Sequence, residues 1–339
     1  MKKYVLKRIA YLIVVFFIVS FLMYALYNLI PSDPARNQLE GVKKSLRPEE
    51  YQRRYNELRE EMGLDDHLVV RYARWMGLAP QKQTGKIYGL LEGNFGTSTF
   101  FKKDVVDVVG PPIGNTVLIN LLVAVLALGI TIPLGIYCAV HKNGKIDSVT
   151  QVLTIIGYSI PIYIVALVFI FLFAVTLGIF PVGGMETPNN NFTGVKAFLD
   201  KVYYLMLPVI VMTFASLGGM TRYVRSSMID ALSMDHIKTA RAKGVKEKVV
   251  IYSHAWRNAL LPVITLIIGW FLTIFSGSVI IENTFSLNGM GKLYINALFN
   301  HDFDLALAIQ MFYTVVALVG ALITDLSYGL VDPRVRIDK

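Results

Sequence analysis

The sequence has little of what a catalytic or metal-binding protein needs. Its 339 residues include one cysteine, Cys138, which excludes an internal disulfide and any metal centre built from several cysteines. The patterns HExxH, CxxC and GxSxG are missing, and the five histidines lack the spacing of metal ligands. We therefore expect no catalytic residues, no metal ligands and no cofactor site in this chain.

Charge is scarce as well, and it is segregated. Charged residues make up 17% of the chain and hydrophobic residues 54%, against about 25% charged residues in soluble domains. Long uncharged stretches alternate with short charged ones, which is typical of a helical protein that crosses the membrane several times. The net charge of +9 could indicate a nucleic-acid partner. The basic residues cluster at the ends of the apolar stretches, however, so membrane topology explains them and we expect no nucleic acid.

Six apolar segments are long enough for a hydrocarbon core of about 30 Å at about 1.5 Å per residue. They are Ile9–Ile30, Ile113–Val140, a stretch within Ser148–Phe180, Val202–Thr221, Asn258–Ile281 and Leu305–Thr324. The first is longer than the apolar region of a signal peptide, about 7–15 residues, so we expect an uncleaved membrane helix. The sequence thus predicts an all-α polytopic membrane protein with six transmembrane helices and a long external loop after the first.

The short loops differ in their content of Lys and Arg. Seventeen such residues fall in the N-terminus, the 141–147 turn, the 222–257 loop and the tail, whereas the short loops opposite hold three, Lys196, Lys201 and Lys292. The positive-inside rule then places both termini in the cytoplasm. We divide the chain into the N-terminus and first helix (1–30), an external region with short helices (31–112), a core with five transmembrane helices and the cytoplasmic 222–257 loop (113–330), and a cytoplasmic tail (331–339).

The external region has helix signals of its own. "RPEEYQRRYNELREEMGL" has Pro48 at a helix start, acidic residues in the first turn and Gly63 as a stop, which predicts an amphipathic helix on the outer face. In the next segment Leu68, Tyr72 and Trp75 share one helical stripe. Because Trp and Tyr favour the interface, we expect this stripe to pack at the membrane surface.

A source of energy is not visible in the chain. "NGMGK" around Gly291 lacks the first Gly and the final Ser or Thr of a phosphate-binding loop. The apolar segments are nearly free of ionisable residues, which in carriers mark ion pathways. We therefore expect another subunit to supply the energy. The alternatives are a self-sufficient secondary transporter or channel, which would need charged residues in mid-membrane, and an intramembrane enzyme, which would need paired catalytic residues at depth.

A compact basic stretch, "DHIKTARAKGVKEKVVIYSHAWRNALLP" at 235–262, lies between two apolar segments. Ser233 and Asp235 are suitable N-caps and Gly244 suits the left-handed residue after a helix end. On this short helix Ile237, Ala240 and Gly244 share a stripe that would let another backbone approach, while Lys238, Thr239 and Ala242 turn away. The residues alone leave open a partner site and a simple positive-inside loop.

The same stretch resembles the cytoplasmic coupling motif of ABC-importer permeases, EAA, three residues, Gly, nine residues, I-x-L-P. "KTA" at 238–240 and Gly244 match, but Lys238 replaces the acidic residue and "HAWR" stands at 254–257. The oligopeptide/dipeptide/nickel branch has a closer version, "DYVRTARAKG…RHALRNALLP". Six further segments match that branch: "IPSDPA" (30–35), "MGLDDHLVVRYARW" (62–75, with His67 where Pro is usual), "GNFGTS" (93–98), "SIP" (159–161), "ENTFSLNGMGKL" (282–293) and "DPRVR" (332–336).

The resemblance implies a B-type permease subunit that forms half of a pore in the inner membrane of a bacterial or archaeal cell. Its implied partners are a C-type permease subunit, two cytoplasmic ABC ATPases that use ATP-Mg, an external substrate-binding protein and membrane lipids. Peptides are the implied substrate, with nickel or glutathione as alternatives.

The resemblance also implies roles for individual residues. The implied ATPase-coupling residues are Asp235, Ile237, Ala240, Arg241, Lys243 and Gly244, with Asp235 as the helix cap. Candidates for binding-protein contact are Glu282, Asn288, Gly289 and Gly291. From residue type alone, candidates for pore-lining helix kinks are Pro161, Gly218 and Gly219, with close helix packing as the alternative for the two glycines.

Overall fold

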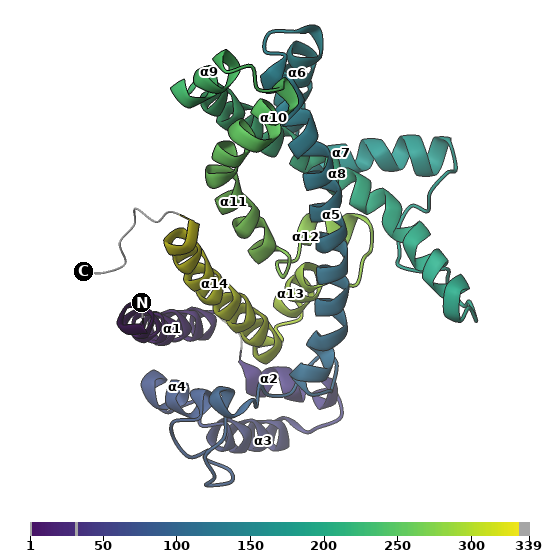
Figure 1. Cartoon of the computed structure of the whole chain (residues 1–339). Coiled ribbons are helices and arrows are strands. Elements are labelled where there is room, and N and C mark those ends of the chain that lie inside the picture. Colours follow the sequence, from purple (N-terminus) through teal and green to yellow (C-terminus); the bar gives the residue numbers. More distant parts are fainter. Residues whose placement is uncertain (1, 31–32, 332–339) are drawn as a thin grey trace. The chain divides into compact units, whose positions relative to one another are not determined.

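The computed structural model describes residues 2–30 and 33–331, and in this part of the chain the regular secondary structure is helical (Figure 1). The order is α1 (Lys2–Leu29), α2 (Pro34–Leu39), η1 (Glu40–Val42), α3 (Pro48–Glu61), α4 (Leu68–Met76), η2 (Leu90–Glu92), α5 (Val105–Val140), α6 (Lys145–Ser159), α7 (Ile162–Phe169), η3 (Ile170–Thr176), α8 (Gly194–Ser233), α9 (Asp235–Ala242), α10 (Glu247–Val249), η4 (Val250–Ala255), α11 (Trp256–Thr273), α12 (Val279–Thr284), α13 (Met290–Phe299) and α14 (Phe303–Val331). The predicted tail motif "DPRVR" lies outside the described residues.

Five helical segments are long and apolar enough to cross a membrane, and a bent pair, α6 with α7 and η3, raises the number to six if it counts as one span. The five are Tyr4–Leu29, Val105–Val140, Gly194–Ser233, Glu247–Thr273 and Phe303–Ser327. The prediction of an all-α polytopic membrane protein is confirmed. Several helices extend beyond their predicted apolar segments: α5 begins at Val105 and α8 continues to Ser233.

The third and fifth predicted spans differ from the structure. The third is bent by 103° between α6 and α7, because Pro161 lacks a backbone N–H and disfavours helical geometry in the residue before it. The fifth ends at Thr273 rather than Ile281. There the chain leaves the helix so that Gly277 can lie against the backbone of Gly291, where a Cβ atom would overlap.

One compact unit contains Lys2–Pro112 and Leu293–Leu318. Its α3 starts at Pro48 and is followed by Gly63 at φ +62°, as predicted. Helix α4 packs on α1: the Tyr72 hydroxyl lies 2.7 Å from Ser20 Oγ, and the Trp75 ring lies 5.2 Å from that of Tyr24. Tyr72 is thus buried against α1, and the position of this stripe at the membrane surface stays a prediction.

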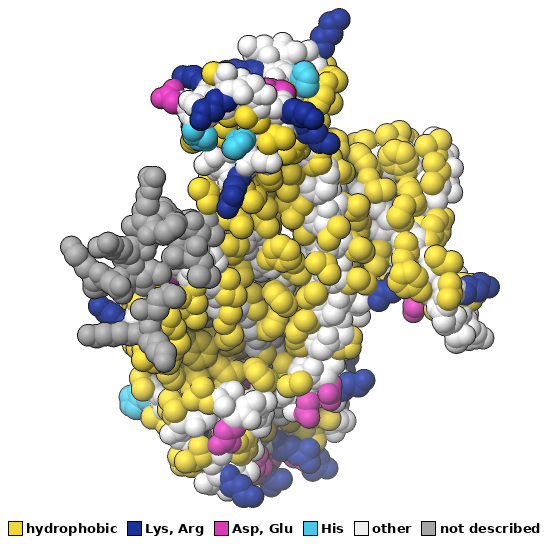
Figure 2. Space-filling model, in the orientation of Figure 1, with side chains coloured by type: hydrophobic (Ala, Val, Ile, Leu, Met, Phe, Trp, Pro, Cys, Tyr) yellow, Lys and Arg dark blue, Asp and Glu magenta, His cyan; other side chains and the backbone are white. Residues whose placement is uncertain are grey.

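The other unit contains Ile113–Lys292 and the end of α14 from Val319. Helix α8 is central to it and contacts α6, α7, α9 and α11. One buried cluster joins α7, α8 and α12 through side chains such as Val165, Leu207 and Phe285. A second cluster joins α8, α9, η4 and α11. Hydrophobic side chains also cover the outside of the long helices, whereas Lys, Arg and His gather around α9 and α10 (Figure 2), as a membrane-spanning bundle with a polar end requires.

Candidate functional site

The short helix α9 begins and ends at defined residues. Its N-cap is Met234, which makes no side-chain capping bond, so the prediction that Asp235 is the cap was wrong. Asp235 instead occupies the first turn, where a carboxylate favours the helix dipole, and it accepts a 2.9 Å bond from Lys238 Nζ. The predicted end is confirmed: Gly244 follows at φ +74°, a left-handed conformation that favours glycine.

The predicted small-residue stripe faces the chain's own interior. Ile237 is 0% exposed and packs in the cluster that includes Met228 and Val250, with Ala240 half-buried beside it. Burying the largest apolar side chain of the helix fixes this orientation. The prediction that Ile237 receives a partner's backbone was therefore wrong, since η4 of the same chain lies there. Ala240 is half-buried, and its contact with a partner stays a prediction. The outward face includes Asp235, His236, Lys238, Thr239 and Ala242.

Arg241 is engaged within the chain. Its Nη2 lies 2.6 Å from Glu247 Oε1 and its Nε lies 3.2 Å from Oε2, and both side chains are exposed. The hydrogen bond to Glu247 holds the pKa of Arg241 above its usual value. Together the two residues close the turn between α9 and α10. Lys243 and Gly244 are exposed in this turn, and a Cβ on Gly244 would meet nothing within 4 Å.

A second ion pair at the same end of the unit is buried. Arg225 on α8 donates from Nε to Asp147 Oδ1 at 2.6 Å and from Nη2 to Oδ2 at 2.7 Å, which joins α8 to α6. Asp147 is 2% exposed and also accepts a 2.8 Å bond from the backbone N–H of Asn143. Such bidentate Arg–carboxylate geometry is the strong form of the interaction.

Glu282 forms a buried anchor for the segment after α12. Its Oε1 accepts from Thr116 Oγ1 (3.1 Å) and its Oε2 accepts from the backbone N–H of Lys292 (2.8 Å). Burial raises the pKa of Glu282. Gly289 lies so close that a Cβ there would overlap the Glu282 carboxylate.

This arrangement corrects a prediction about the same segment. Glu282, Gly289 and Gly291 are buried, so their predicted contact with an external protein was wrong. Asn288 is exposed and stays a candidate.

Comparisons with known proteins cover both halves of the chain. The family described as "Binding-protein-dependent transport system inner membrane component" matches residues 131–337, and the N-terminal region of the same kind of component matches residues 1–120. The oligopeptide transport system permease protein AppB of Bacillus subtilis is 34% identical over 337 residues, which is 99% of this chain and 100% of the relative. The chain belongs to this permease family. The dipeptide transport system permease protein DppB of Lactococcus lactis is 30% identical, with 99% of the permease and 100% of the relative covered.

The predicted kink residues have different places in the permease. Pro161 lies at the sharp bend between α6 and α7. Gly218 permits close packing of α8 on α6, because a Cβ there would lie 2.8 Å from the carbonyl oxygen of Thr154. Gly219 has open space. Helix α8 continues through both glycines, and a kink at them stays a prediction.

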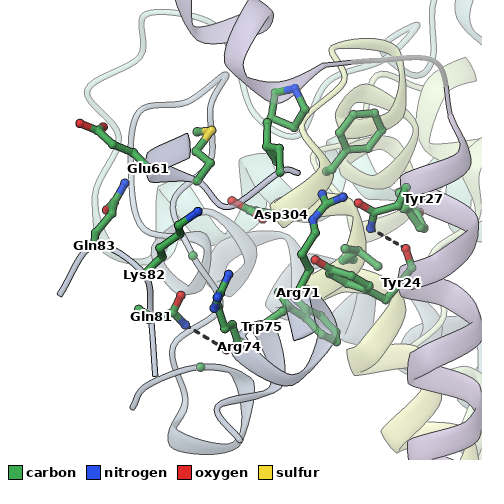
Figure 3. A pocket seen from close by; sticks show the side chains of 18 of the residues that line it. Tyr24, Tyr27, Glu61, Arg71, Arg74, Trp75, Gln81, Lys82, Gln83 and Asp304 are labelled. Carbon is green, nitrogen blue, oxygen red and sulfur yellow. Dashed lines mark hydrogen bonds between the residues drawn. The ribbon is translucent and has the colours of Figure 1, made fainter. Parts of the chain in front are cut away.

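The permease also has features that sequence reasoning missed. In the Asp147–Arg225 pair, Arg225 was counted only as loop charge and Asp147 was not singled out, although an Asp in the first turn of a helix can signal a structural role. A cavity of about 460 Å³ in the unit that contains α1–α4 was not foreseen at all. Its lining combines residues of α1, α4, the 81–96 segment and the start of α14 (Figure 3), and no periodicity in a sequence brings such distant segments together.

Proposed function

We propose that this permease imports di- and oligopeptides as one of two pore-forming subunits of an ATP-driven transporter. The names of its relatives support this substrate class: AppB is an oligopeptide permease and DppB a dipeptide permease. In this proposal the second pore subunit is a C-type permease, two cytoplasmic ATPases bind ATP-Mg, and an external binding protein delivers the peptide. The chain itself contributes the path and the coupling, without a cofactor of its own.

The observation that carries the coupling role is the attachment of α9. Ile237 anchors α9 in the cluster that also holds Met228 of α8 and Val263 of α11. Helix α8 and the α10–α11 segment are both candidate membrane spans. Because packed interiors transmit displacement rather than absorb it, a pull on α9 moves the ends of two spans together. A nucleotide-driven change in the ATPases would bias the permease between two states in this way.

The outward face of α9 is the proposed docking surface for an ATPase. Asp235, Lys238, Thr239 and Ala242 are exposed there, and Lys243 and Gly244 extend the surface into the following turn. Ile237 and Ala240 act from the inside, as the attachment. Arg241 shapes the turn through Glu247. The six residues implied by the resemblance to couple the ATPase thus have separate roles in this proposal: some dock the ATPase, some attach α9 to the bundle, and Arg241 shapes the turn.

The proposed orientation places both termini and α9 in the cytoplasm. Seventeen Lys and Arg residues in the segments on that side, against three in the short loops opposite, support it. Two termini on the same side require an even number of membrane crossings. The bent pair of α6 with α7 and η3 must then count as one span, which makes six. The 31–112 region then lies outside the cell membrane.

Site-directed crosslinking tests the docking surface. The single native cysteine, Cys138, is buried, so a cysteine introduced at Ala242 is the accessible one. We expect Ala242→Cys to crosslink to the ATPase subunit in the assembled transporter. Ser45→Cys, exposed in the other unit, serves as the control and should not. Normal peptide uptake without any crosslink from Ala242→Cys would contradict the proposal.

A second measurement tests the substrate. We expect the ATPase activity of the reconstituted transporter to rise when its binding protein carries a peptide. Stimulation by nickel or glutathione instead of peptides would overturn the substrate assignment while leaving the coupling assignment intact.

A further inference from the structure

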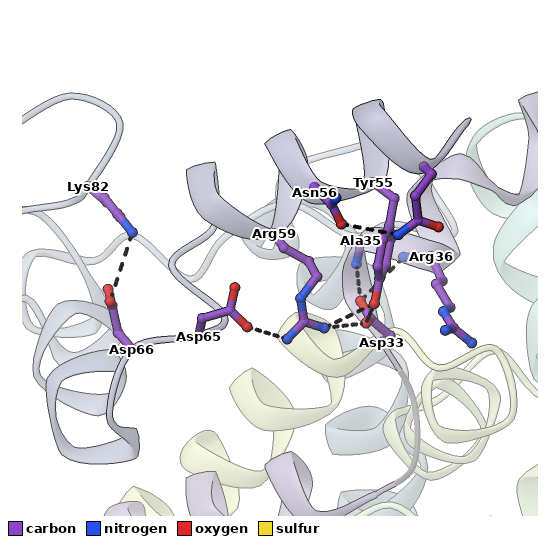
Figure 4. Close-up of polar contacts among 10 residues, drawn as sticks. Asp33, Ala35, Arg36, Tyr55, Asn56, Arg59, Asp65, Asp66 and Lys82 are labelled. Atoms are coloured by element: carbon purple, nitrogen blue, oxygen red, sulfur yellow. Dashed lines mark hydrogen bonds and ion pairs between the residues drawn. The ribbon is translucent and has the colours of Figure 1, made fainter. Parts of the chain in front are cut away.

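The cavity beside α1 and α4 contains several charged side chains, most of which are already paired. Arg59 contacts Asp33 and Asp65, at 2.6 Å and 2.5 Å (Figure 4). Arg74 contacts Asp66 at 2.5 Å. Lys82 lies 3.8 Å from the same carboxylate. Asp33, Arg59, Arg74 and Lys82 line the cavity, and these ion pairs largely neutralise their charges.

Among the charged residues of the lining, Glu61 is exposed and two others that lack an ion pair are half-buried. Arg71 on α4 and Asp304 at the start of α14 both line it and are half-buried. Among residues 2–30 and 33–331, Arg71 and Asp304 have no ion-pair partner with an N–O distance of 4.0 Å or less. They therefore do not form an ion pair with each other. Tyr24 lines the same cavity. The site therefore presents a separated cation and anion to one space (Figure 3).

The position of Asp304 is held by its neighbours. Asp302, which is 0% exposed, accepts bonds from Ser98 Oγ (2.5 Å) and from the backbone N–H of Thr99 (3.2 Å). This fixes the 96–100 segment against the start of α14. Gly96 lies directly on Asp304, since a Cβ there would be 3.1 Å from Asp304 Oδ2. The Asp304 carboxylate therefore packs against Gly96, which lines the same cavity.

Aromatic side chains complete the lining. Tyr24, Tyr27, Trp75 and Phe303 all border the cavity. Tyr27 is fixed by a 3.0 Å bond to the Tyr294 hydroxyl and by edge contact with Phe303. Small-molecule sites typically measure about 300–1,000 Å³ and combine apolar walls with a few placed polar groups. The cavity of about 460 Å³ has both properties.

We propose that this cavity binds the zwitterion of a short peptide, with its carboxylate at Arg71, its ammonium at Asp304 and its side chains against Tyr24 and Trp75. A guanidinium donates two parallel bonds to a carboxylate, and charge-assisted bonds of this kind are the strong ones. A ligand with both charges satisfies Arg71 and Asp304 together, whereas a simple anion leaves Asp304 unpaired. The identification of the ligand as a peptide rests on the proposed function. The requirement for one carboxylate, one ammonium group and apolar contacts rests on the cavity.

Fluorescence of Trp75 provides a direct test. The chain has three tryptophans, Trp75, Trp256 and Trp270, so the double substitution Trp256→Phe and Trp270→Phe leaves the one that lines the cavity. The purified full chain is titrated with trialanine that has free termini, and with trialanine that is acetylated and amidated. We expect a saturable change in emission with the free peptide only. Equal binding of the blocked peptide would overturn the proposal.

Charge variants assign the two ends of the ligand. We expect Arg71→Gln and Asp304→Asn each to weaken binding of the free peptide by at least about tenfold, as the loss of a charged hydrogen bond predicts. Peptide blocked only at its carboxyl end should lose its sensitivity to Arg71→Gln. Arg71→Lys keeps the charge and should retain part of the affinity, which guards against a folding defect. Arg53→Gln on exposed α3 is the matched control and should bind as the parent does.

Two other ligands decide between related chemistries. Inorganic phosphate that binds as well as the peptide would show a simple anion site, and glycerophosphoethanolamine that binds better would show a lipid headgroup site; either result overturns the proposal. The measurement uses the permease without ATPase or binding protein. A failure here therefore leaves the proposed transport function standing, and a failure of peptide-stimulated ATPase activity leaves the cavity test valid.

Discussion

Two Arg–carboxylate pairs lie at the cation-rich end of one unit, and they differ in burial. Asp147 and Arg225 have side chains 2% and 18% exposed, whereas Arg241 and Glu247 are 44% and 53% exposed. The shortest N–O distance is 2.6 Å in both. Distance alone therefore does not distinguish them; their surroundings do.

The difference separates a structural joint from an adjustable turn. In the buried pair each charge has left water, so each depends on its partner. In the exposed pair water replaces a lost partner, and such pairs contribute about 0–1 kcal/mol. We infer that Asp147–Arg225 fixes α6 against α8, while Arg241–Glu247 is free to rearrange when a partner docks on α9.

The largest expected effect is the loss of one half of the buried pair. Arg225→Ala leaves the Asp147 carboxylate buried without its cation, which we expect to destabilise the permease by about 3–5 kcal/mol. The measurement is the thermal unfolding midpoint in detergent. The double variant Asp147→Leu with Arg225→Met removes both charges and should recover most of the loss. A single variant as stable as the parent would show that the pair is not a joint.

Loss of the Glu282 anchor ranks second. Glu282→Ala leaves Thr116 Oγ1 and the backbone N–H of Lys292 without their acceptor. An unsatisfied buried polar group costs about 1–3 kcal/mol, so the unfolding midpoint should fall clearly but less than for Arg225→Ala. Thr284→Ala removes an exposed hydroxyl that bonds only within its helix and is the control. An equal effect of both variants would contradict the anchor role.

The sequence predicted the elements better than their contacts. Apolar length revealed the spans because a membrane demands about 20 apolar residues in a row, and Gly63 and Gly244 marked helix ends because left-handed backbone favours glycine. The direction of the α9 stripe was predicted wrongly. A stripe of small and apolar residues has the same pattern whether it faces a partner or its own core, and the burial of Ile237 became visible only in three dimensions.

Buried polar groups were the least predictable part of the site. Glu282 was taken for a surface residue because it stands among Asn, Ser and Gly in a segment that reads as a loop. Its acceptor role depends on Thr116, 166 residues away in the chain, and on the backbone N–H of Lys292, 10 residues away. Arg71 and Asp304 likewise stand far apart in the chain. Patterns along the chain report local geometry, and these contacts are not local.

The third expected effect concerns the exposed pair. A double-mutant cycle with Arg241→Ala and Glu247→Ala should give a coupling free energy below about 1 kcal/mol, because solvent screens both groups. Under the proposed function, Arg241→Ala should nevertheless reduce peptide-stimulated ATPase activity, since the turn at the docking surface loses its shape. Unchanged ATPase activity together with a large coupling energy would reverse the distinction between the two pairs.

The smallest expected effect extends the comparison to Asp33, whose environment is intermediate. Burial acts to raise the pKa of Asp33. Hydrogen bonds from Tyr55 and from the backbone N–H groups of Arg36 and Ala35 act in the opposite direction, as does the charge of Arg59. These effects outweigh burial, so the pKa of Asp33 lies below its ordinary value of 3.8. Because the folded-state pKa is lower than the unfolded-state pKa, the carboxylate stabilises the fold fully above the unfolded-state pKa. This contribution is lost as the pH falls through the folded-state pKa. The contacts of α2 with α3 should therefore persist to a pH below about 4 in the parent. The Asp33→Asn variant should be less stable than the parent at neutral pH, and its stability should fall less on acidification.

Proteolysis in the segment between α2 and α3, followed from pH 7 downward, measures both differences. Identical pH profiles for the two proteins would mean that Asp33 stabilises α2 and α3 no more than an exposed pair does.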